Sequence, residues 1–160
     1  MSELNLGIIG GGQLGSMLSS AAKKLNINTI IYCDDNEAPA QNFCNEFVCG
    51  KYDNKQKILE FVNKVDLITY EFENIPYETL KEINKIKPVL PKPSVNRLIQ
   101  HRLAEKDFIN KLNIRTTRYA SIEKRSDIEA LEDFLPGILK TTTLGYDGKG
   151  QYPIQKIEDL

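Results

Sequence analysis

The feature that most constrains the fold is an apolar strand that runs directly into a glycine turn and a helix. The strand is predicted from the run Leu6–Ile9, the turn from residues 10–12, and the helix from apolar residues spaced three and four apart over residues 13–25. The next run of β-branched and aromatic residues, Thr29–Cys33, predicts a second strand. Strand, helix and strand in this order favour a right-handed parallel unit.

The same alternation continues to about residue 93. We expect further elements at Phe47–Cys49, Asp53–Val62, Asp66–Tyr70, Pro76–Ile86 and Val89–Leu90. The helix after the glycine turn is predicted from one apolar stripe at helical spacing, which is Leu14, Met17, Leu18, Ala21 and Leu25. A second stripe, expected to face inward from a helix capped by Asp53, is Ile58, Leu59, Phe61 and Val62. These elements predict an α/β fold built on a doubly wound parallel sheet.

Two prolines, Pro91 and Pro93, mark the predicted domain boundary. We therefore divide the chain into residues 1–93 and residues 94–160. In the second part we expect a helix over Arg102–Leu112, a strand over Tyr119–Ile122, a helix from a capping box at Ser126 to Phe134, and two antiparallel strands, Ile138–Thr141 and Gln151–Ile154. The last two strands flank a glycine-containing loop.

The composition is that of an ordinary globular protein. Lys and Arg number 21 against 22 Asp and Glu, so the net charge of -1 gives no reason to expect a nucleic-acid partner. No apolar run approaches the ~20 residues of a membrane span and the N-terminus has no signal-peptide pattern, so we expect a cytoplasmic protein without a membrane partner. Three cysteines without a C-x-x-C pair and a single histidine predict reduced thiols and no metal site in this chain.

The glycine turn is the first candidate site. Gly10, Gly12 and Gly15 satisfy G-x-G-x-x-G, and exposed amides at a helix start favour a phosphate. Asp34 stands about 20 residues beyond Gly15, where a nicotinamide enzyme has its ribose-binding acid. A dinucleotide site therefore remains an alternative, as does a turn whose glycines only allow close packing of strand and helix.

The second candidate site follows the strand that ends at Tyr70. Glu71 and Glu73 lie at the carboxyl edge of the predicted sheet, where ligands of open α/β sheets bind. If the chain stays extended, both carboxylates point the same way and can accept hydrogen bonds from an amine or from ribose hydroxyls. The alternative is a solvated acidic turn.

The third candidate site is Lys140 with the loop that carries Gly145, Gly148 and Gly150. Lysine reaches a phosphate as a point charge, while loop amides wrap other phosphate oxygens. The spacing is not that of a Walker A motif. A plain hairpin turning at Asp147 and Gly148 explains the same residues.

Six segments taken together resemble one enzyme family. They are GIIGGGQLG at 7–15, APA at 38–40, TYEFENIP at 69–76, KPS at 92–94, HRLAEKDFINKLNIRT at 101–116 and ILKTTTLGYDGKGQ at 138–151. The chain resembles the 5-(carboxyamino)imidazole ribonucleotide synthases, ATP-grasp enzymes of purine biosynthesis. The resemblance implies a Rossmann-like pre-ATP-grasp domain followed by the beginning of an ATP-grasp α+β domain, and it argues against the nicotinamide site.

The resemblance also implies a reaction and its residues. ATP phosphorylates bicarbonate, and the carboxyphosphate carboxylates the amine of 5-aminoimidazole ribonucleotide, giving 5-carboxyaminoimidazole ribonucleotide, ADP and phosphate. The implied ribonucleotide-binding residues are Gly12, Gln13, Leu14 and Glu71. The implied ATP-binding residues are Arg102, Lys140, Gly145, Tyr146, Asp147, Gly148, Lys149, Gly150 and Gln151, with Lys140 and Tyr146 as catalytic residues. Mg2+ ligands are expected in chain beyond these 160 residues, and the full-length family is expected to be a homodimer.

Departures from the family pattern put parts of the site in question. Ser16 stands where the family usually has arginine, Leu144 where it has glycine, and His101 where aspartate is common, which removes a helix cap worth about 0.5–2 kcal/mol unless histidine substitutes. Because the family continues for about as much chain again, we expect an N-terminal fragment that does not turn over alone. A remaining alternative is a non-catalytic remnant domain that binds the ribonucleotide at Gln13 and Glu71 but binds ATP poorly.

Overall fold

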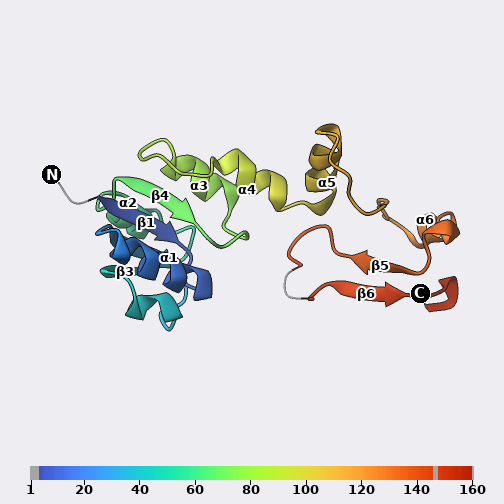
Figure 1. Cartoon of the computed structure of the whole chain (residues 1–160), viewed down its shortest axis with the longest axis horizontal. Helices are drawn as coiled ribbons and strands as arrows, with labels where there is room; N and C mark the ends of the chain where they lie inside the picture. Colours follow the sequence, from blue (N-terminus) through green and yellow to red (C-terminus); the bar gives the residue numbers. More distant parts are fainter. Residues whose placement is uncertain (1–3, 146–147, 160) are drawn as a thin grey trace. The chain divides into compact units, whose positions relative to one another are not determined.

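The structure is a computed structural model that describes residues 4–145 and 148–159 (Figure 1). The chain divides into two compact units, one reaching Arg97 and the other beginning at Leu98. The helix α4 (Pro93–Ile99) contains this division. The first unit is built on a parallel sheet, and the second contains a two-stranded antiparallel sheet.

A four-stranded parallel sheet forms the centre of the first unit (Figure 1). Its strands are β1 (Asn5–Ile9), β2 (Asn28–Cys33), β3 (Glu46–Cys49) and β4 (Leu67–Tyr70), in the spatial order β3-β2-β1-β4. Each neighbouring pair is parallel. The predicted doubly wound α/β fold is therefore confirmed, although the expected strand at Val89 is only an isolated parallel bridge to Ile68.

The larger core cluster lies on the face of the sheet that is covered by α2 (Lys55–Val62) and α3 (Tyr77–Ile83). Phe61 from α2 and Leu80 from α3 are both fully buried in it. The ring of Phe61 lies 5.5 Å from the ring of Tyr32 on β2, at a tilted angle that suits aromatic pairs. This cluster fixes both helices against the strands that carry the glycine turn.

The opposite face is covered by α1 (Gln13–Lys24) and η1 (Pro39–Asn42), but α1 turns its small residues inward. The buried residues of α1 are Gly15, Ser16, Ser19 and Ala22. The predicted helix is confirmed, but the apolar residues whose spacing predicted it lie largely on the outer side, since Leu14, Met17 and Leu25 are 55%, 59% and 70% exposed. A Cβ atom on Gly15 would lie 2.9 Å from the carbonyl oxygen of Gly10, so the helix start lies too close to the strand end for large side chains.

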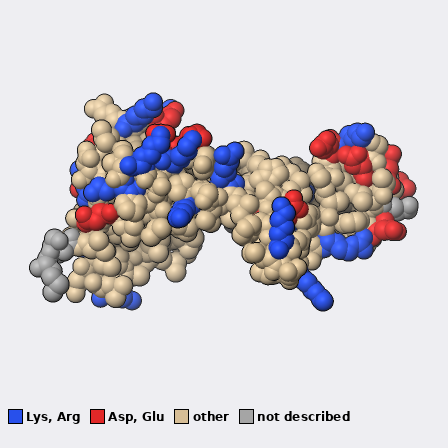
Figure 2. All heavy atoms as spheres, turned by 90° about the horizontal axis from the view of Figure 1, so that it is seen from above, with Lys and Arg blue, Asp and Glu red and all other residues tan. Residues whose placement is uncertain are grey.

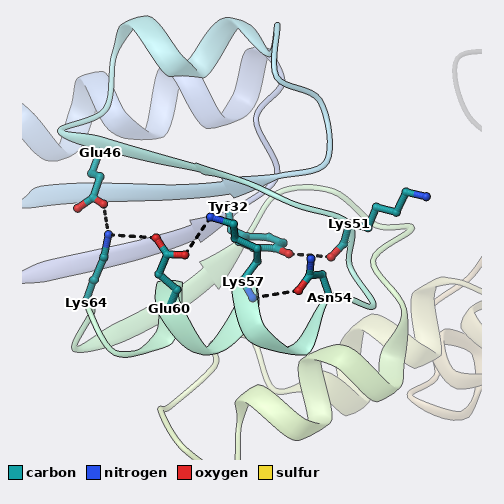
Figure 3. Close-up of polar contacts among 7 residues, drawn as sticks. All are labelled: Tyr32, Glu46, Lys51, Asn54, Lys57, Glu60 and Lys64. Atoms are coloured by element: carbon teal, nitrogen blue, oxygen red, sulfur yellow. Dashed lines mark hydrogen bonds and ion pairs between the residues drawn. The ribbon is translucent and has the colours of Figure 1, made fainter.

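The start of α2 differs by one residue from the prediction. Asn54, not Asp53, is the N-cap, and its Oδ1 accepts a hydrogen bond from the backbone N–H of Lys57 at 3.1 Å (Figure 3). Beside it, the buried hydroxyl of Tyr32 donates to the carbonyl oxygen of Lys51 at 2.7 Å (Figure 3). Burial raises the pKa of Tyr32 to about 12, so the hydroxyl remains a neutral donor.

The second unit holds short helices and the two-stranded sheet. Its elements are α5 (Arg102–Lys111), α6 (Arg125–Glu129), η2 (Glu132–Phe134), β5 (Gly137–Lys140), β6 (Gln151–Ile154) and η3 (Ile157–Asp159). β5 and β6 pair antiparallel, as predicted. The capping box expected at Ser126 is displaced, because α6 begins at Arg125 and Asp127 Oδ2 accepts from the backbone N–H of Lys124 at 3.1 Å.

The strand predicted over residues 119–122 is wrong, since those residues are outside every helix and strand. The side chain of Tyr119 bonds instead to α5. Its hydroxyl donates to Asp107 Oδ1 at 2.6 Å and accepts from Asn110 Nδ2 at 3.0 Å. Aromatic and β-branched composition alone did not reveal this local side-chain alternative to strand pairing.

Charged side chains of both signs lie interspersed on the face seen in Figure 2. This pattern agrees with the near balance of 21 basic and 22 acidic residues in the sequence. Within residues 4–145 and 148–159, no helix is long and apolar enough to cross a bilayer.

The core of the first unit can be tested on two side chains of α2. Phe61→Ala should lower the free energy of unfolding by about 3–5 kcal/mol, because it empties a fully buried ring position. Leu59, which was predicted to face inward, is 48% exposed, so Leu59→Ala should cost under about 1 kcal/mol. Urea denaturation followed by circular dichroism measures both, and equal losses would contradict this packing.

Candidate functional site

The glycine turn and Glu71 form one site in the first unit. Glu71 Oε1 accepts a hydrogen bond from the backbone N–H of Gly12 at 3.0 Å, and the Glu71 backbone N–H donates to the carbonyl oxygen of Ile9 at 3.1 Å. Gly10 has φ +111, and a Cβ atom there would lie 2.7 Å from Glu71 Oε1. The glycines therefore let an acidic side chain of a neighbouring strand end lie directly against the start of α1.

This arrangement bears on the dinucleotide alternative. In a phosphate-binding glycine turn, the amides at the helix start bind phosphate oxygens. Here the Gly12 amide already binds a carboxylate of the same chain. A pyrophosphate at this turn would meet the negative charge of Glu71, and like charges at close range repel. Asp34, the acid expected for a ribose, is exposed and lies beyond β2.

The other predicted ribonucleotide residues surround the same turn. Gln13 and Leu14 begin α1 and are exposed, so their side chains are accessible from solvent. Ser16, where the resemblance predicted an arginine, is 8% exposed, and its hydroxyl donates to the carbonyl oxygen of Gly12 at 3.1 Å. Serine thus supports the turn from within, and it adds no positive charge.

Glu73 does not extend the site in the way that alternation predicts. The chain turns at Glu73 and Asn74, so the condition of a continuing extended segment is not met. The Glu73 carbonyl oxygen instead accepts from Asn96 Nδ2 at 2.9 Å. Asn96 lies on α4, is fully buried, and was not singled out from the sequence. No local pattern could have found it, because its partner is 23 residues away.

Tyr52 is another residue near the glycine turn that was not singled out from the sequence. Burial raises the pKa of Tyr52, and the nearby Cys33, Asp34 and Glu71 raise it further. Its hydroxyl is therefore a neutral hydrogen-bond donor at physiological pH. Burial also raises the pKa of Cys33, so this thiol is a packing residue and not a reactive thiolate.

The predicted ATP loop lies in the second unit and is closed at its base. Lys140 on β5 and Gln151 on β6 are partners in the antiparallel register. Next to them, the Thr141 backbone N–H donates to the carbonyl oxygen of Gly150 at 2.9 Å. Gly150 has φ +65, and a Cβ atom there would lie 2.5 Å from Thr141 Oγ1. This glycine is required by both conformation and space.

The remaining predicted loop residues differ in how much the structure says of them. Lys140, Gly148 and Lys149 are exposed, and Gly148 has φ +82 with open space around it. Tyr146 and Asp147, predicted as catalytic and ATP-binding residues, lie outside the described residues.

Arg102 is directed at the loop. Its Nε donates to the Thr141 carbonyl oxygen at 3.1 Å and its Nη2 to the Gly145 carbonyl oxygen at 2.7 Å. Its backbone N–H also donates to the Thr142 carbonyl oxygen at 2.9 Å. Sequence reasoning predicted a phosphate ligand at this position, and the structure adds contacts to the loop backbone that no spacing rule indicates.

Two of the departures from the family pattern occupy special backbone positions. Leu144 has φ +59, a left-handed conformation that favours glycine, and its side chain is 73% exposed. His101 is the N-cap of α5, and its Nδ1 accepts from the Ala104 backbone N–H at 3.4 Å. Histidine therefore substitutes for the aspartate cap, through a long hydrogen bond.

No group of three or more His, Cys, Asp or Glu side chains that could hold a metal ion occurs among the described residues. The arrangement offers an acidic acceptor at the glycine turn and, in the other unit, cationic side chains beside a glycine loop. These are groups that bind an amine-bearing substrate and an anion, respectively.

Comparison with known proteins assigns the chain to a family. The profile described as "Ribonucleotide synthetase preATP-grasp domain" matches residues 3–100, and the profile described as "ATP-grasp domain" matches residues 107–160. The chain belongs to the ribonucleotide synthetase preATP-grasp family. Its fold is a pre-ATP-grasp domain followed by the start of an ATP-grasp domain.

Relatives of this family member are enzymes of purine synthesis. The chain is 38% identical to the bifunctional purine synthesis protein purC/E of Dictyostelium discoideum, over 97% of this chain and 16% of the relative. It is 35% identical to the N5-carboxyaminoimidazole ribonucleotide synthase of Pseudomonas aeruginosa, over 98% of this chain and 44% of that enzyme. These relatives confirm the resemblance seen in the sequence.

A solved structure gives the same result. N5-carboxyaminoimidazole synthetase from Staphylococcus aureus, complexed with ADP, superimposes with a TM-score of 0.90 at 33% identity. The match covers 99% of this chain and 43% of that enzyme. This family member therefore spans less than half the length of the synthases that it matches.

The strained position in the loop is directly testable. Leu144→Gly should stabilise the conformation seen here by up to about 1 kcal/mol, because relief of left-handed strain exceeds the added entropy of glycine. Leu144→Ala keeps the strain and removes only exposed apolar surface, so it should change little. Thermal unfolding and exchange of the Thr141 amide, which donates to the Gly150 carbonyl oxygen at the base of the loop, measure the effect, and equal behaviour of the two variants would contradict the strain.

Proposed function

We propose that this chain supplies the ribonucleotide-binding domain and part of the ATP site of an N5-carboxyaminoimidazole ribonucleotide synthase. In the proposed reaction, ATP phosphorylates bicarbonate to give carboxyphosphate and ADP, and carboxyphosphate then carboxylates the amine of 5-aminoimidazole ribonucleotide with release of phosphate. The observation that carries the proposal is the position of Glu71 on the Gly12 amide. It places a carboxylate acceptor at the carboxyl edge of the sheet, where such folds bind ligands.

The proposed roles follow from chemistry. Glu71 accepts hydrogen bonds from the amine or ribose hydroxyls of the ribonucleotide, and the exposed Gln13 and Leu14 contact the same molecule. Lys140 and Arg102 bind ATP phosphates, the first as a point charge and the second as a planar fork. We also propose Gly145 to Gln151 as the ATP loop, with Tyr146 near the carboxyphosphate.

We propose that the magnesium ligands lie outside these 160 residues. Phosphoryl transfer relies on bound metal to neutralise developing charge. The chain spans 44% of the Pseudomonas aeruginosa synthase that it matches, and we propose that the magnesium ligands belong to the remainder of the full-length enzyme. We further propose a cytoplasmic location, a homodimer for the full-length enzyme, and domains over residues 1–93 and 94–160.

The alternatives make different predictions. A nicotinamide-binding module would bind NADH and lose it on Asp34→Ala, whereas Glu71 at the glycine turn opposes a pyrophosphate there. A non-catalytic remnant domain would bind 5-aminoimidazole ribonucleotide but not ATP. Titration calorimetry of this chain with the ribonucleotide, ATP and NADH distinguishes all three, and the proposal requires binding of the first two.

Glu71→Gln should weaken ribonucleotide binding about tenfold, because it removes the negative charge. Glutamine keeps an Oε1 acceptor for the Gly12 amide, so the turn should survive. Glu73→Gln is the matched control on the same turn and should leave affinity within about twofold. Calorimetry measures both, and equal effects of the two variants would remove Glu71 from the site.

Lys140→Ala should weaken ATP binding about tenfold and leave ribonucleotide binding unchanged, since one exposed charge is lost. The thermal midpoint should stay within about 1 °C, because the side chain is exposed on β5. ATP affinity equal to that of the unsubstituted chain would show that Lys140 does not contact the nucleotide.

A further inference from the structure

The side chain and backbone of Arg102 hold residues 141–145 at three points. Nε and Nη2 donate to the carbonyl oxygens of Thr141 and Gly145, and the Arg102 backbone N–H donates to that of Thr142. The two side-chain bonds are charge-assisted, at 3.1 and 2.7 Å. One residue at the start of α5 therefore fixes the segment that enters the glycine loop.

Leu144 lies between the points that Arg102 holds. Its φ of +59 is unfavourable for a branched side chain, and its 73% exposure means that little burial offsets this cost. Backbone strain of this kind persists only where the surroundings over-determine the conformation. The bonds on either side, at Thr142 and Gly145, are contacts that can do this.

Packing at Gly145 supports the same conclusion. A Cβ atom on Gly145 would lie 3.0 Å from Arg102 Nη2, 3.0 Å from Thr141 Oγ1 and 3.1 Å from the Lys149 carbonyl oxygen. The guanidinium, the strand end and the returning chain thus meet around one glycine. A movement of Arg102 would open space on one side of Gly145.

The guanidinium of Arg102 is also suited to a ligand. It carries five N–H groups, and within residues 4–145 and 148–159 its hydrogen bonds are the two to Thr141 and Gly145. The positive charge and planar fork suit a phosphate. A phosphate that binds Arg102 in this rotamer would stabilise the rotamer by mass action.

We propose that Arg102 is a positioning residue that holds Leu144 in its left-handed conformation and so sets the path of the chain into the glycine loop. We further propose, as an extension, that a phosphate bound at Arg102 strengthens the contacts of Arg102 with residues 141–145. Only the extension rests on the proposed ATP function, because the first statement concerns the chain without ligand.

The first experiment uses the chain without nucleotide. Amide exchange at positions 141 and 102, whose N–H groups donate to the carbonyl oxygens of Gly150 and Thr142, and the HN–Hα coupling of Leu144, which reports φ, are measured by NMR. Arg102→Lys keeps the charge but cannot fork to two carbonyls, so exchange at these two amides should rise roughly tenfold and the coupling should change. Leu144→Gly in the Arg102→Lys background should restore slow exchange at both amides to within about threefold of the original.

Arg118→Lys is the matched control. Arg118 lies in the same unit, donates to the Asp133 carbonyl oxygen at 3.2 Å and stacks on Phe134, away from the loop. It should leave exchange at the amides of Thr141 and Arg102, and the coupling of Leu144, unchanged. Circular dichroism confirms that each variant is folded. Unchanged exchange and coupling in Arg102→Lys would overturn the proposal, as would an equal change in Arg118→Lys.

The second experiment adds ATP. With saturating ATP, exchange at the amides of positions 141 and 102 should slow at least threefold in the unsubstituted chain and less in Arg102→Lys. ATP binding without slower exchange would overturn the extension and leave the proposed function standing. Absence of ATP binding would contradict the proposed function, while the result without nucleotide would still decide the role of Arg102.

Discussion

The hydrogen bond between Glu71 and the Gly12 amide is the interaction on which the geometry of the candidate site in the first unit depends. It joins the end of β4 to the start of α1 across the carboxyl edge of the sheet. The bond forms because Gly10 leaves room for the carboxylate, since a Cβ atom there would lie 2.7 Å from Glu71 Oε1. A glycine turn with the sequence pattern of a phosphate-binding loop thus binds a carboxylate of the same chain.

In the second unit, Arg102 likewise binds a glycine-rich segment that is distant in sequence. One guanidinium joins the first turn of α5 to both sides of a strained backbone position. In each unit a charged side chain far away in sequence determines the shape of a glycine-rich turn. The two glycine motifs are therefore defined as much by their charged partners as by the glycines themselves.

The sequence predicted the parallel sheet, the antiparallel pair and the glycine motifs, because periodicity and turn chemistry are local signals. It did not predict the contacts of Asn96 or Arg102, since their partners are 23 and up to 43 residues away. Tyr119 shows the opposite failure, in which strand propensity was overridden by hydrogen bonds to α5. Substrate assignments at Gln13, Leu14 and Lys140 rest on family resemblance and remain predictions.

The inverted packing of α1 has a consequence for tolerance to mutation. In most surface helices the large apolar positions are the sensitive ones and the small positions vary freely. In α1 the sheet side is Gly15, Ser16, Ser19 and Ala22, where added volume meets backbone or buried neighbours. The side chains of Leu14, Met17 and Leu25 are more than half exposed. Large residues at the small positions should therefore destabilise this unit, whereas polar residues in place of Met17 or Leu25 should not, so a ranking by hydrophobicity would assign the risk to the wrong side of the helix.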